Sequence, residues 1–477
     1  RMGDFYEMFF DDAVAAAAAL DIALTKRGKH NGDDIPMCGV PAHSAEAYLL
    51  TLIRKGFRVA ICEQMESPEE AKKRGSKSVV RRDVVRLVTP GTLTEDTLLE
   101  ARRNNFLAAY AEARGESALA WTDISTGEFM VMTCPPVRLG PELARLMPRE
   151  VLVSDSMDIA RQDGLAEGGA AVTPWSPGSF DSTSAEARLG RLFDVATLEG
   201  FGDFARAEMS AMGALVDYLE LTQKGALPLL RAPRRLAQDR LLQLDAATRR
   251  NLELTHALSG GRANSLLSIL DRTLTAGGAR LLERRLTGPS TDLATIQDRH
   301  DAIGFCVSDN LVRDVLEDGL RRIPDLERAL SRLSLDRAGP RDLAAIRDGL
   351  AGAERLAKAI SPQDIPTLLA DAADDLVGHD ALNELLDHAL VAEPPVQLRD
   401  GGMVAPGFHE ELDEARTLRD EGRGVIGKMQ AEYSAETAVQ SLKIKHNNVL
   451  GYFIETTATH AEKMLSPPLS ERYIHRQ

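Results

Sequence analysis

Residues 3–10 have the sequence GDFYEMFF, which places four aromatic side chains within six residues. Only 5% of the whole chain is aromatic, so this stretch stands out. Because side chains alternate along a β-strand, Phe5, Glu7 and Phe9 would share one face, with a carboxylate between two phenyl rings. The stretch predicts either a core strand with Glu7 at its edge or an exposed element that binds a ligand.

The second interpretation is a nucleic-acid contact. Phe5 would enter a base step as a wedge, Glu7 would accept a hydrogen bond from a base N–H, and neighbouring cations would hold phosphates. Residues 51–88 carry ten basic side chains against five acidic ones, a local net charge of +5. The whole chain has a net charge of −15, so a uniformly basic coat is excluded and any polyanion site must be local. The ten basic residues are Arg54, Lys55, Arg58, Lys72, Lys73, Arg74, Lys77, Arg81, Arg82 and Arg86.

The rest of residues 1–88 has the pattern of a small mixed α/β domain. An alanine-rich helix follows the aromatic stretch, residues 35–39 (IPMCG) predict a turn, and a second helix is expected with Ser44 as its N-cap. Val59–Cys62 predicts a strand. Residues 88–92 (VTPGT) then predict a turn, since Pro and Gly interrupt both helix and strand.

A second α/β unit follows this turn. Leu119–Ile124 and Phe129–Met132 flank four turn residues and predict a hairpin. Residues 141–150 are expected to be helical and Val151–Ser154 to form a strand, which favours layers of helix and sheet. Residues 168–184, rich in Gly, Pro, Ser and Thr, predict a surface loop.

From about Leu236 the composition changes to Leu, Ala, Arg and Glu at helical spacing, which predicts a helical domain. Asn264 is expected to cap one of its helices. Further helices are expected at Asp325–Leu335, Asp342–Ala359 and His409–Tyr433. Near the end of the chain, Leu442–Lys445 and Val449–Thr456 predict a β-hairpin.

Residues 422–428 (GRGVIGK) match GxGxxG and the first seven positions of the phosphate-loop pattern GxxxxGK[ST]. The eighth residue, Met429, has no hydroxyl for Mg²⁺. The preceding residues 410–421 are charged and helical where a buried strand is required. An apolar stripe at helical spacing continues through the glycines, so the motif predicts a long helix instead of a nucleotide loop.

Asp123 lies at a position where nucleases that use two metal ions carry a carboxylate. Such chemistry needs several oxygen ligands around the ions, and the neighbouring strand offers only Asp155 at its edge. We therefore expect Asp123 to be a solvated residue of the hairpin. Four histidines without a catalytic sequence frame are expected at the surface or in hydrogen bonds: His43, His256, His300 and His446.

The four cysteines form no CxxC pair and have no histidine at ligand spacing, which predicts a reducing compartment and no structural zinc. The longest apolar run, Ala13–Leu20, is too short to span a membrane.

The chain starts at Arg1 without an initiator Met and stops at Gln477 without a helix stop signal. We therefore expect it to be an internal piece of a longer protein.

Several stretches together resemble the MutS family of bacterial DNA mismatch-recognition proteins. In chain order they are RMGDFYE (1–7), TKRG (25–28), VAICEQ (59–64), VTPGT (88–92), LDAATRRNLEL (244–254), DGG (400–402) and GYFI (451–454). Several motifs in the right order are more specific than any one of them. They extend over essentially the whole chain.

The resemblance implies a multidomain fold with α/β and all-α parts. It implies a mismatch-binding α/β domain at 1–88, a linker at 89–104, a ribonuclease H-like connector at 105–235, a helical core with long lever helices at 236–430 and an incomplete β clamp at 431–477. The ATPase domain of the family, which uses ATP and Mg²⁺ and depends on DNA, is expected outside this chain. The chain itself is therefore not expected to be an enzyme.

The resemblance also implies roles for single residues. Phe5 is expected to stack at the mispaired base, and Glu7 is expected to be the hydrogen-bonding partner of that base. Residues expected near the DNA backbone are Lys26, Arg27, Arg81, Arg82, Lys443, Lys445 and Asn447. No catalytic residue, metal or cofactor is expected in this chain.

The implied partners are double-stranded DNA with mismatches or small loops, a second copy in a homodimer, MutL and the replication sliding clamp. The implied location is the bacterial cytoplasm, in association with the nucleoid and away from membranes. The rival function is a metal-dependent nuclease or a branched-DNA-binding protein that uses the ribonuclease H-like domain.

Overall fold

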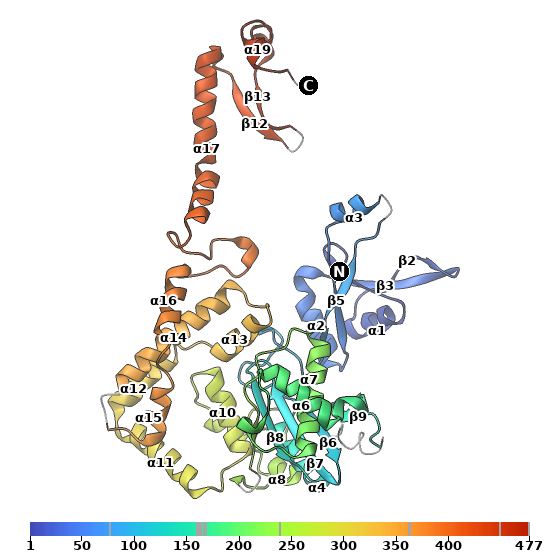
Figure 1. Ribbon diagram of the computed structural model, residues 1–477, viewed down its shortest axis with the longest axis vertical. Helices are drawn as coiled ribbons and strands as arrows, with labels where there is room; N and C mark the ends of the chain where they lie inside the picture. Colours follow the sequence, from blue (N-terminus) through green and yellow to red (C-terminus); the bar gives the residue numbers. More distant parts are fainter. Residues whose placement is uncertain are drawn as a thin grey trace. The chain divides into compact units, whose positions relative to one another are not determined.

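The computed structural model describes residues 1–75, 78–158, 165, 169–237, 240–360, 364–447 and 450–475, and of Arg423 only the backbone. The chain divides into two compact units (Figure 1). The first comprises residues 1–387 and 393–401. The second comprises residues 388–392 and 402–477.

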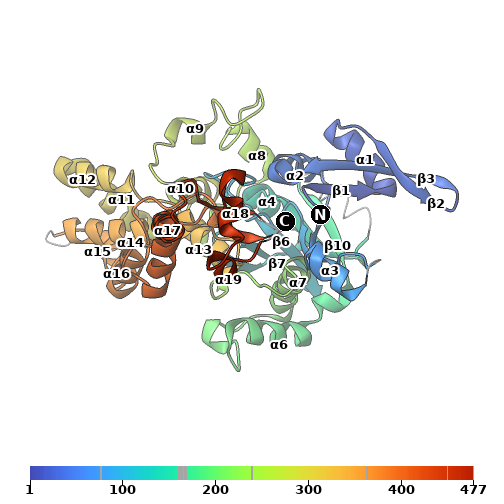
Figure 2. The ribbon, with the colours of Figure 1, turned by 90° about the horizontal axis from the view of Figure 1, so that it is seen from above.

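The N-terminal part of the first unit contains a three-stranded antiparallel sheet in the order β1-β3-β2. Its elements are β1 (Phe5–Phe9), α1 (Phe10–Leu20), β2 (Thr25–His30) and β3 (Asp33–Pro41). Helix α1 lies beside β1 and β3 (Figure 2) and buries Ala13, Ala16 and Ala17 together with Cys38 of β3. Small alanines let the helix approach the sheet closely, so this short segment forms a core of its own.

The predicted turn at residues 35–39 is wrong, because these residues lie inside β3, the central strand. Proline in a central strand is tolerated mainly beside a bulge, since it has no N–H to donate. Pro36 lies opposite Lys26, where the register of β2 shifts. The Pro and Gly that suggested a turn therefore mark an irregular strand.

A second, two-stranded antiparallel ribbon completes this part of the unit. Its strands and the neighbouring helices are α2 (Ala45–Arg54), β4 (Val59–Gln64), α3 (Pro68–Arg74) and β5 (Arg82–Val88). Ser44 occupies the N-cap position of α2, but its hydroxyl donates to Pro41 O at 3.4 Å and does not cap the helix. The predicted helix start is therefore confirmed and the predicted capping bond is wrong.

The next part of the first unit is a six-stranded sheet in the order β10-β9-β6-β7-β8-β11. Its elements are β6 (Leu107–Ala113), β7 (Glu116–Asp123), β8 (Glu128–Thr133), α4 (Pro136–Leu146), β9 (Glu150–Ser154), β10 (Ala171–Trp175), α6 (Ser182–Phe193), α7 (Arg206–Thr222) and β11 (Arg234–Arg235). Figure 2 shows α4 on one side of the sheet and α6 and α7 on the other. Two apolar cores therefore enclose the sheet, as expected for layered α/β packing.

The hairpin of β7 and β8 and the strand β9 confirm the predictions for this part. The predicted surface loop at 168–184 is wrong, because it contains β10 and the start of α6, while Gly168 lies outside the described residues. β10 is an edge strand that pairs with β9 alone, so a Pro at position 174 does not interrupt the sheet. The predicted helix at 141–150 is displaced, because α4 begins at Pro136 and Glu150 belongs to β9.

The remainder of the first unit is helical, as predicted. Its helices are α8 (Ala246–Asn251), α9 (Leu266–Leu270), α10 (Ala276–Thr287), α11 (Leu293–Ser308), α12 (Asn310–Leu320), α13 (Leu326–Ser334), α14 (Pro340–Ile360) and α15 (Thr367–Asp374). Helix α16 (Asp380–Ala389) leads into the second unit. The cap of α9 is Ser265, whose side chain accepts from the Ser268 N–H, so the prediction that Asn264 caps this helix is wrong.

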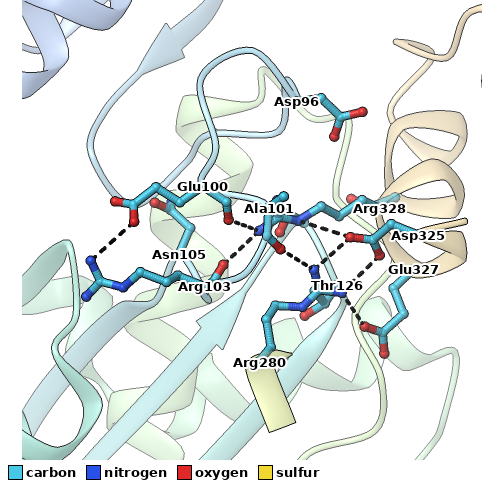
Figure 3. A network of polar contacts seen from close by, with 12 residues as sticks. Asp96, Glu100, Ala101, Arg103, Asn105, Thr126, Arg280, Asp325, Glu327 and Arg328 are labelled. Carbon is cyan, nitrogen blue, oxygen red and sulfur yellow. Dashed lines mark hydrogen bonds and ion pairs between the residues drawn. The ribbon is translucent and has the colours of Figure 1, made fainter. Parts of the chain in front are cut away.

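Two buried arginines hold the segment that precedes β6 to the helical part (Figure 3). Arg280 on α10 donates to Ala101 O at 3.0 Å and to Asp325 at 2.7 and 2.9 Å. It also donates to Glu327 at 3.0 Å. Arg328 on α13 donates to Glu100 O at 3.2 Å and to Arg103 O at 2.8 Å. These guanidinium groups replace the water that would otherwise bind the linker carbonyls.

Burial lowers the pKa of the Arg280 guanidinium, but the hydrogen bonds to Asp325 and Glu327 outweigh burial and raise it overall. The pKa of Asp325 is lowered, because its contacts with Arg280 outweigh the opposing effect of burial. The pair therefore stays ionised at neutral pH. It ties α10 to the start of α13.

The second unit contains the long helix α17 (Glu410–Thr437) and the hairpin of β12 (Lys443–Asn447) and β13 (Gly451–Glu455). Both elements confirm the predictions, although Asn448 and Val449 lie outside the described residues. The helix runs without a break through residues 422–428. Its apolar stripe stays exposed, with 72% of Leu418 and 49% of Val425 accessible to solvent.

Replacing Gly422, Gly424 and Gly427 together with alanine is expected to stabilise α17. Apart from the adjoining residues and the nearby backbone of the helix itself, no atom lies within 4 Å of a Cβ built at any of the three positions, so the methyl groups meet no obstacle. Glycine in a helix costs about 1 kcal/mol relative to alanine at each position. Thermal unfolding followed by far-UV circular dichroism should therefore shift to higher temperature. An unchanged or lower unfolding temperature would contradict the expectation that the three glycines destabilise the helix.

Candidate nucleic-acid interface

Phe5 begins β1, an edge strand of the three-stranded sheet, and 48% of its surface is exposed. The other side chains of β1 hold the strand in place. The Tyr6 hydroxyl donates to the Glu63 carboxylate, and Met8 packs against the core under α1. The strand therefore presents a large apolar ring to solvent from a fixed backbone, where the ring is accessible to a ligand.

Glu7 lies two residues further along β1 and pairs with Arg27 on β2. Arg27 Nη1 lies 2.5 Å from Glu7 Oε2, and 13% of the Glu7 side chain is exposed against 55% of the Arg27 side chain. Gly39 on β3 is the strand partner of Glu7. A Cβ built at Gly39 would lie 3.3 Å from Tyr6 O and 3.5 Å from Glu7 Cγ, so the missing side chain leaves room for the Glu7 carboxylate.

The sequence predicts a DNA contact for Arg27 but gives no sign of its ion pair with Glu7. The predicted turn at residues 35–39 includes Gly39, which lies in β3 instead. Charge complementarity between Glu7 and Arg27 was visible in the sequence, but their neighbourhood depends on β3 lying between β1 and β2. No sequence spacing reveals that order of strands.

The other predicted cations of the N-terminal part differ in how accessible their side chains are to a DNA phosphate. Lys26 is exposed and pairs with Asp34 at 2.6 Å. Arg82 is already engaged, because its Nε donates to Arg1 O at 2.9 Å and its Nη1 to Val80 O at 3.1 Å. Arg81 has an exposed side chain, while its backbone N–H donates to Glu66 at 2.7 Å.

The basic segment at 51–88 is less available to phosphates than its charge suggests. Arg86 is buried and pairs with Glu95, and Arg74 pairs with Glu66. Lys55 donates to Ala19 O at 2.6 Å. Lys77 lies outside the described residues. The prediction that the whole segment holds phosphates is therefore wrong for Arg86, whose charge is used inside the fold.

The remaining predicted contacts belong to the second unit, on the hairpin of β12 and β13. Lys443 is exposed, whereas Lys445 pairs with Glu455 at 2.5 Å. The side-chain oxygen of Asn447 accepts from the Leu450 N–H at 2.7 Å. Among these three, Lys443 offers the cation that is most accessible to a phosphate.

Asp123 is fully buried, so the prediction of a solvated residue is wrong. Its carboxylate accepts from Asn104 Nδ2 at 2.9 Å, the Asn105 N–H at 3.0 Å, the Ser125 N–H at 3.0 Å and Ser125 Oγ at 2.6 Å. These donors satisfy the carboxylate and fix the turn after β7. In the described ranges no cluster of three His, Cys, Asp or Glu residues could hold a metal ion.

Comparison with known proteins extends over nearly all of these elements. Family models for MutS domain I, MutS domain II and MutS domain III match residues 1–97, 105–231 and 247–465. Together they cover both the strand that carries Phe5 and the hairpin that carries Lys443. The chain belongs to the MutS family.

Proteins named DNA mismatch repair protein MutS are similar to this MutS-family chain over its full length. Those from Paracoccus denitrificans and Cereibacter sphaeroides are 67% identical to it, and the one from Roseobacter denitrificans is 64% identical. Each comparison covers 100% of this chain and 54% of the relative. The chain therefore spans about half the length of the curated relatives it matches.

The family assignment agrees with a fold of mixed α/β and helical parts. Among the helices that the structure describes, none has the length and apolar character needed to cross a membrane.

Proposed function

We propose that this chain recognises mismatched or unpaired bases in double-stranded DNA and thereby initiates mismatch repair. The exposed ring of Phe5, held on a fixed edge strand beside the Glu7 carboxylate, is the observation that carries the proposal. Phe5 stacks at the mispaired base, and Glu7 accepts a hydrogen bond from it. Lys26, Arg81 and Lys443 supply accessible positive charge for the DNA backbone.

The physical basis is the energy of deforming DNA. A wedge must unstack a base step and kink the duplex, which costs a few kcal/mol. A mispaired base has already lost part of its pairing and stacking, so a defective site is kinked more easily than a matched one. Since about 1.4 kcal/mol corresponds to a tenfold change in affinity, modest differences in this energy give useful discrimination.

We further propose that residues 105–235 form a ribonuclease H-like connector, that 236–430 form a core with lever helices, and that 431–477 belong to a clamp. The sheet order β8-β7-β6-β9-β10, antiparallel and then parallel, supports the connector. The four hydrogen bonds to Asp123 give no support to a metal-dependent nuclease. The connector is therefore proposed as a structural and interaction domain.

ATP and Mg²⁺ are proposed to act in the family outside the region matched here, and this chain is proposed to have no enzymatic activity. Residues 422–428 lie within a continuous helix, which presents no cradle of free amides to a phosphate.

We propose that the longer protein forms a homodimer and acts with MutL and the replication sliding clamp. Its proposed location is the bacterial cytoplasm, in association with the nucleoid.

Competition binding at a stated salt concentration tests the main proposal. The chain is mixed with a labelled duplex that contains one G·T mismatch, and unlabelled matched or mismatched duplex of the same length is added. We expect the mismatched competitor to displace the label at a lower concentration than the matched one. Equal displacement by both competitors would contradict the proposed function.

A further inference from the structure

The contact between Glu7 and Arg27 carries a consequence for how the chain discriminates between duplexes. In the described part of the chain, Arg27 Nη1 is the partner recorded for the Glu7 carboxylate, at 2.5 Å. Arg27 also reaches the Met2 sulfur at 3.6 Å. The mostly buried carboxylate is therefore neutralised by a cation whose side chain is itself 55% exposed to solvent.

A carboxylate near a DNA backbone is repelled by phosphates unless a cation or a hydrogen-bond donor meets it. In a matched duplex the ring N–H groups of guanine and thymine are used in pairing inside the base stack, so they are not available to Glu7. Glu7 then keeps Arg27 as its partner. An unstacked, mispaired base can present a free N–H to Glu7, and this N–H can replace Arg27.

We propose that Arg27 is a specificity-determining residue that exchanges Glu7 for a DNA phosphate only on mismatched DNA. This inference rests on the proposed function, because it needs Glu7 to meet the mispaired base. On matched DNA the guanidinium remains bound to Glu7 and contributes no net charge. On mismatched DNA it is released and neutralises one additional phosphate.

The exchange has a measurable signature in the salt dependence of binding. Each phosphate neutralised by a cation releases counterions and contributes about −0.9 to the slope of log K against log salt on duplex DNA. The slope for mismatched DNA should therefore be steeper than the slope for matched DNA. Arg27 should account for about 0.9 of that difference.

Salt titrations of the chain and of an Arg27→Gln variant test this on a G·T duplex and its matched counterpart. We expect the variant to narrow the slope difference between the two duplexes by about 0.9. Lys26→Gln is the matched control, since Lys26 lies on the same strand and pairs with Asp34 instead of Glu7. This control should change both slopes equally and leave their difference intact.

A Glu7→Gln variant is expected to strengthen binding to matched DNA. Without the carboxylate, Arg27 is free on both duplexes. Matched DNA should therefore bind more tightly, with a slope steeper by about 0.9. In the double variant, Arg27→Gln should remove this gain.

Two outcomes would overturn the inference while leaving the proposed function intact. One is a preference for mismatched DNA with a slope difference that Arg27→Gln does not change. The other is an equal loss of about 0.9 from both slopes in Arg27→Gln, which would make Arg27 a simple phosphate contact. Loss of the proposed function itself would appear separately, as equal displacement by both duplexes in the parent chain.

Discussion

Replacing Phe5 with alanine is expected to abolish the preference for mismatched DNA while leaving most of the salt-dependent binding to matched DNA. The substitution removes a ring that is 48% exposed on an edge strand and removes no cation. Stacking between an aromatic side chain and a base is worth about 1–3 kcal/mol. Affinity for a G·T duplex should therefore fall by between about fivefold and about 140-fold, since 1.4 kcal/mol corresponds to a factor of ten.

The measurement is direct binding of both duplexes at one salt concentration. Phe10→Ala is a suitable control, because Phe10 is 50% exposed but begins α1 and packs edge-on against His30. The control should retain the preference for mismatched DNA. If Phe5→Ala keeps a parental ratio of affinities, the wedge is assigned to the wrong residue.

Replacing Arg280 with alanine is expected to give the largest loss of stability among the variants considered. Removing one partner of a buried ion pair typically costs 3–5 kcal/mol, because it leaves an unpaired charge in the fold. Here Asp325 and Glu327 are partly exposed, with 22% and 39% of their side chains accessible, so water can relieve them. We therefore expect a loss of about 2–3 kcal/mol.

Urea unfolding of the first unit, followed by the fluorescence of Trp121 and Trp175, measures this change. Arg321→Ala is the matched control, since Arg321 forms an exposed pair with Glu317 one helical turn away. Such pairs contribute about 0.3–0.5 kcal/mol. A similar shift in both variants would show that the Arg280 contacts add nothing beyond an ordinary surface pair.

The same contacts predict a dependence on pH. Burial alone would raise the folded-state pKa of Asp325, but its hydrogen bond to Arg280 outweighs burial and lowers that pKa. Its contribution to stability is therefore complete above the unfolded pKa, near 3.9, and is lost as the pH falls through the lower folded value. Arg280→Ala should consequently differ less from the parent chain in acid than at neutral pH.

Sequence periodicity predicted the elements in which local signals agree. The long helix α17 and the β7–β8 hairpin follow from apolar spacing and turn residues, and both are present. The failures at 35–39 and 168–184 have a common cause. Pro and Gly were taken as breaks, although a bulge accommodates Pro36 and an edge position accommodates Pro174.

The candidate interface was only partly predictable for a related reason. The place of Phe5 on a strand follows from the aromatic stretch, but the stretch alone left open whether Phe5 lies in a core or is exposed, as the structure shows it to be. The burial of Asp123 and Arg86 does not follow, because each is satisfied by partners that approach from other segments, such as Asn104 and Glu95. Local sequence gives no measure of such tertiary hydrogen bonds.

The buried arginines of Figure 3 also decide how the linker should respond to a protease. Segments between domains are usually the places where chains are nicked or accept insertions. Here the carbonyls of Glu100, Ala101 and Arg103 accept hydrogen bonds from Arg280 and Arg328. A protease needs an extended, accessible backbone, so this segment must first give up its hydrogen bonds to two buried guanidinium groups before it can be cut. Although its sequence resembles that of a flexible linker, this segment should resist proteolysis for as long as the helices α10 and α13 remain folded.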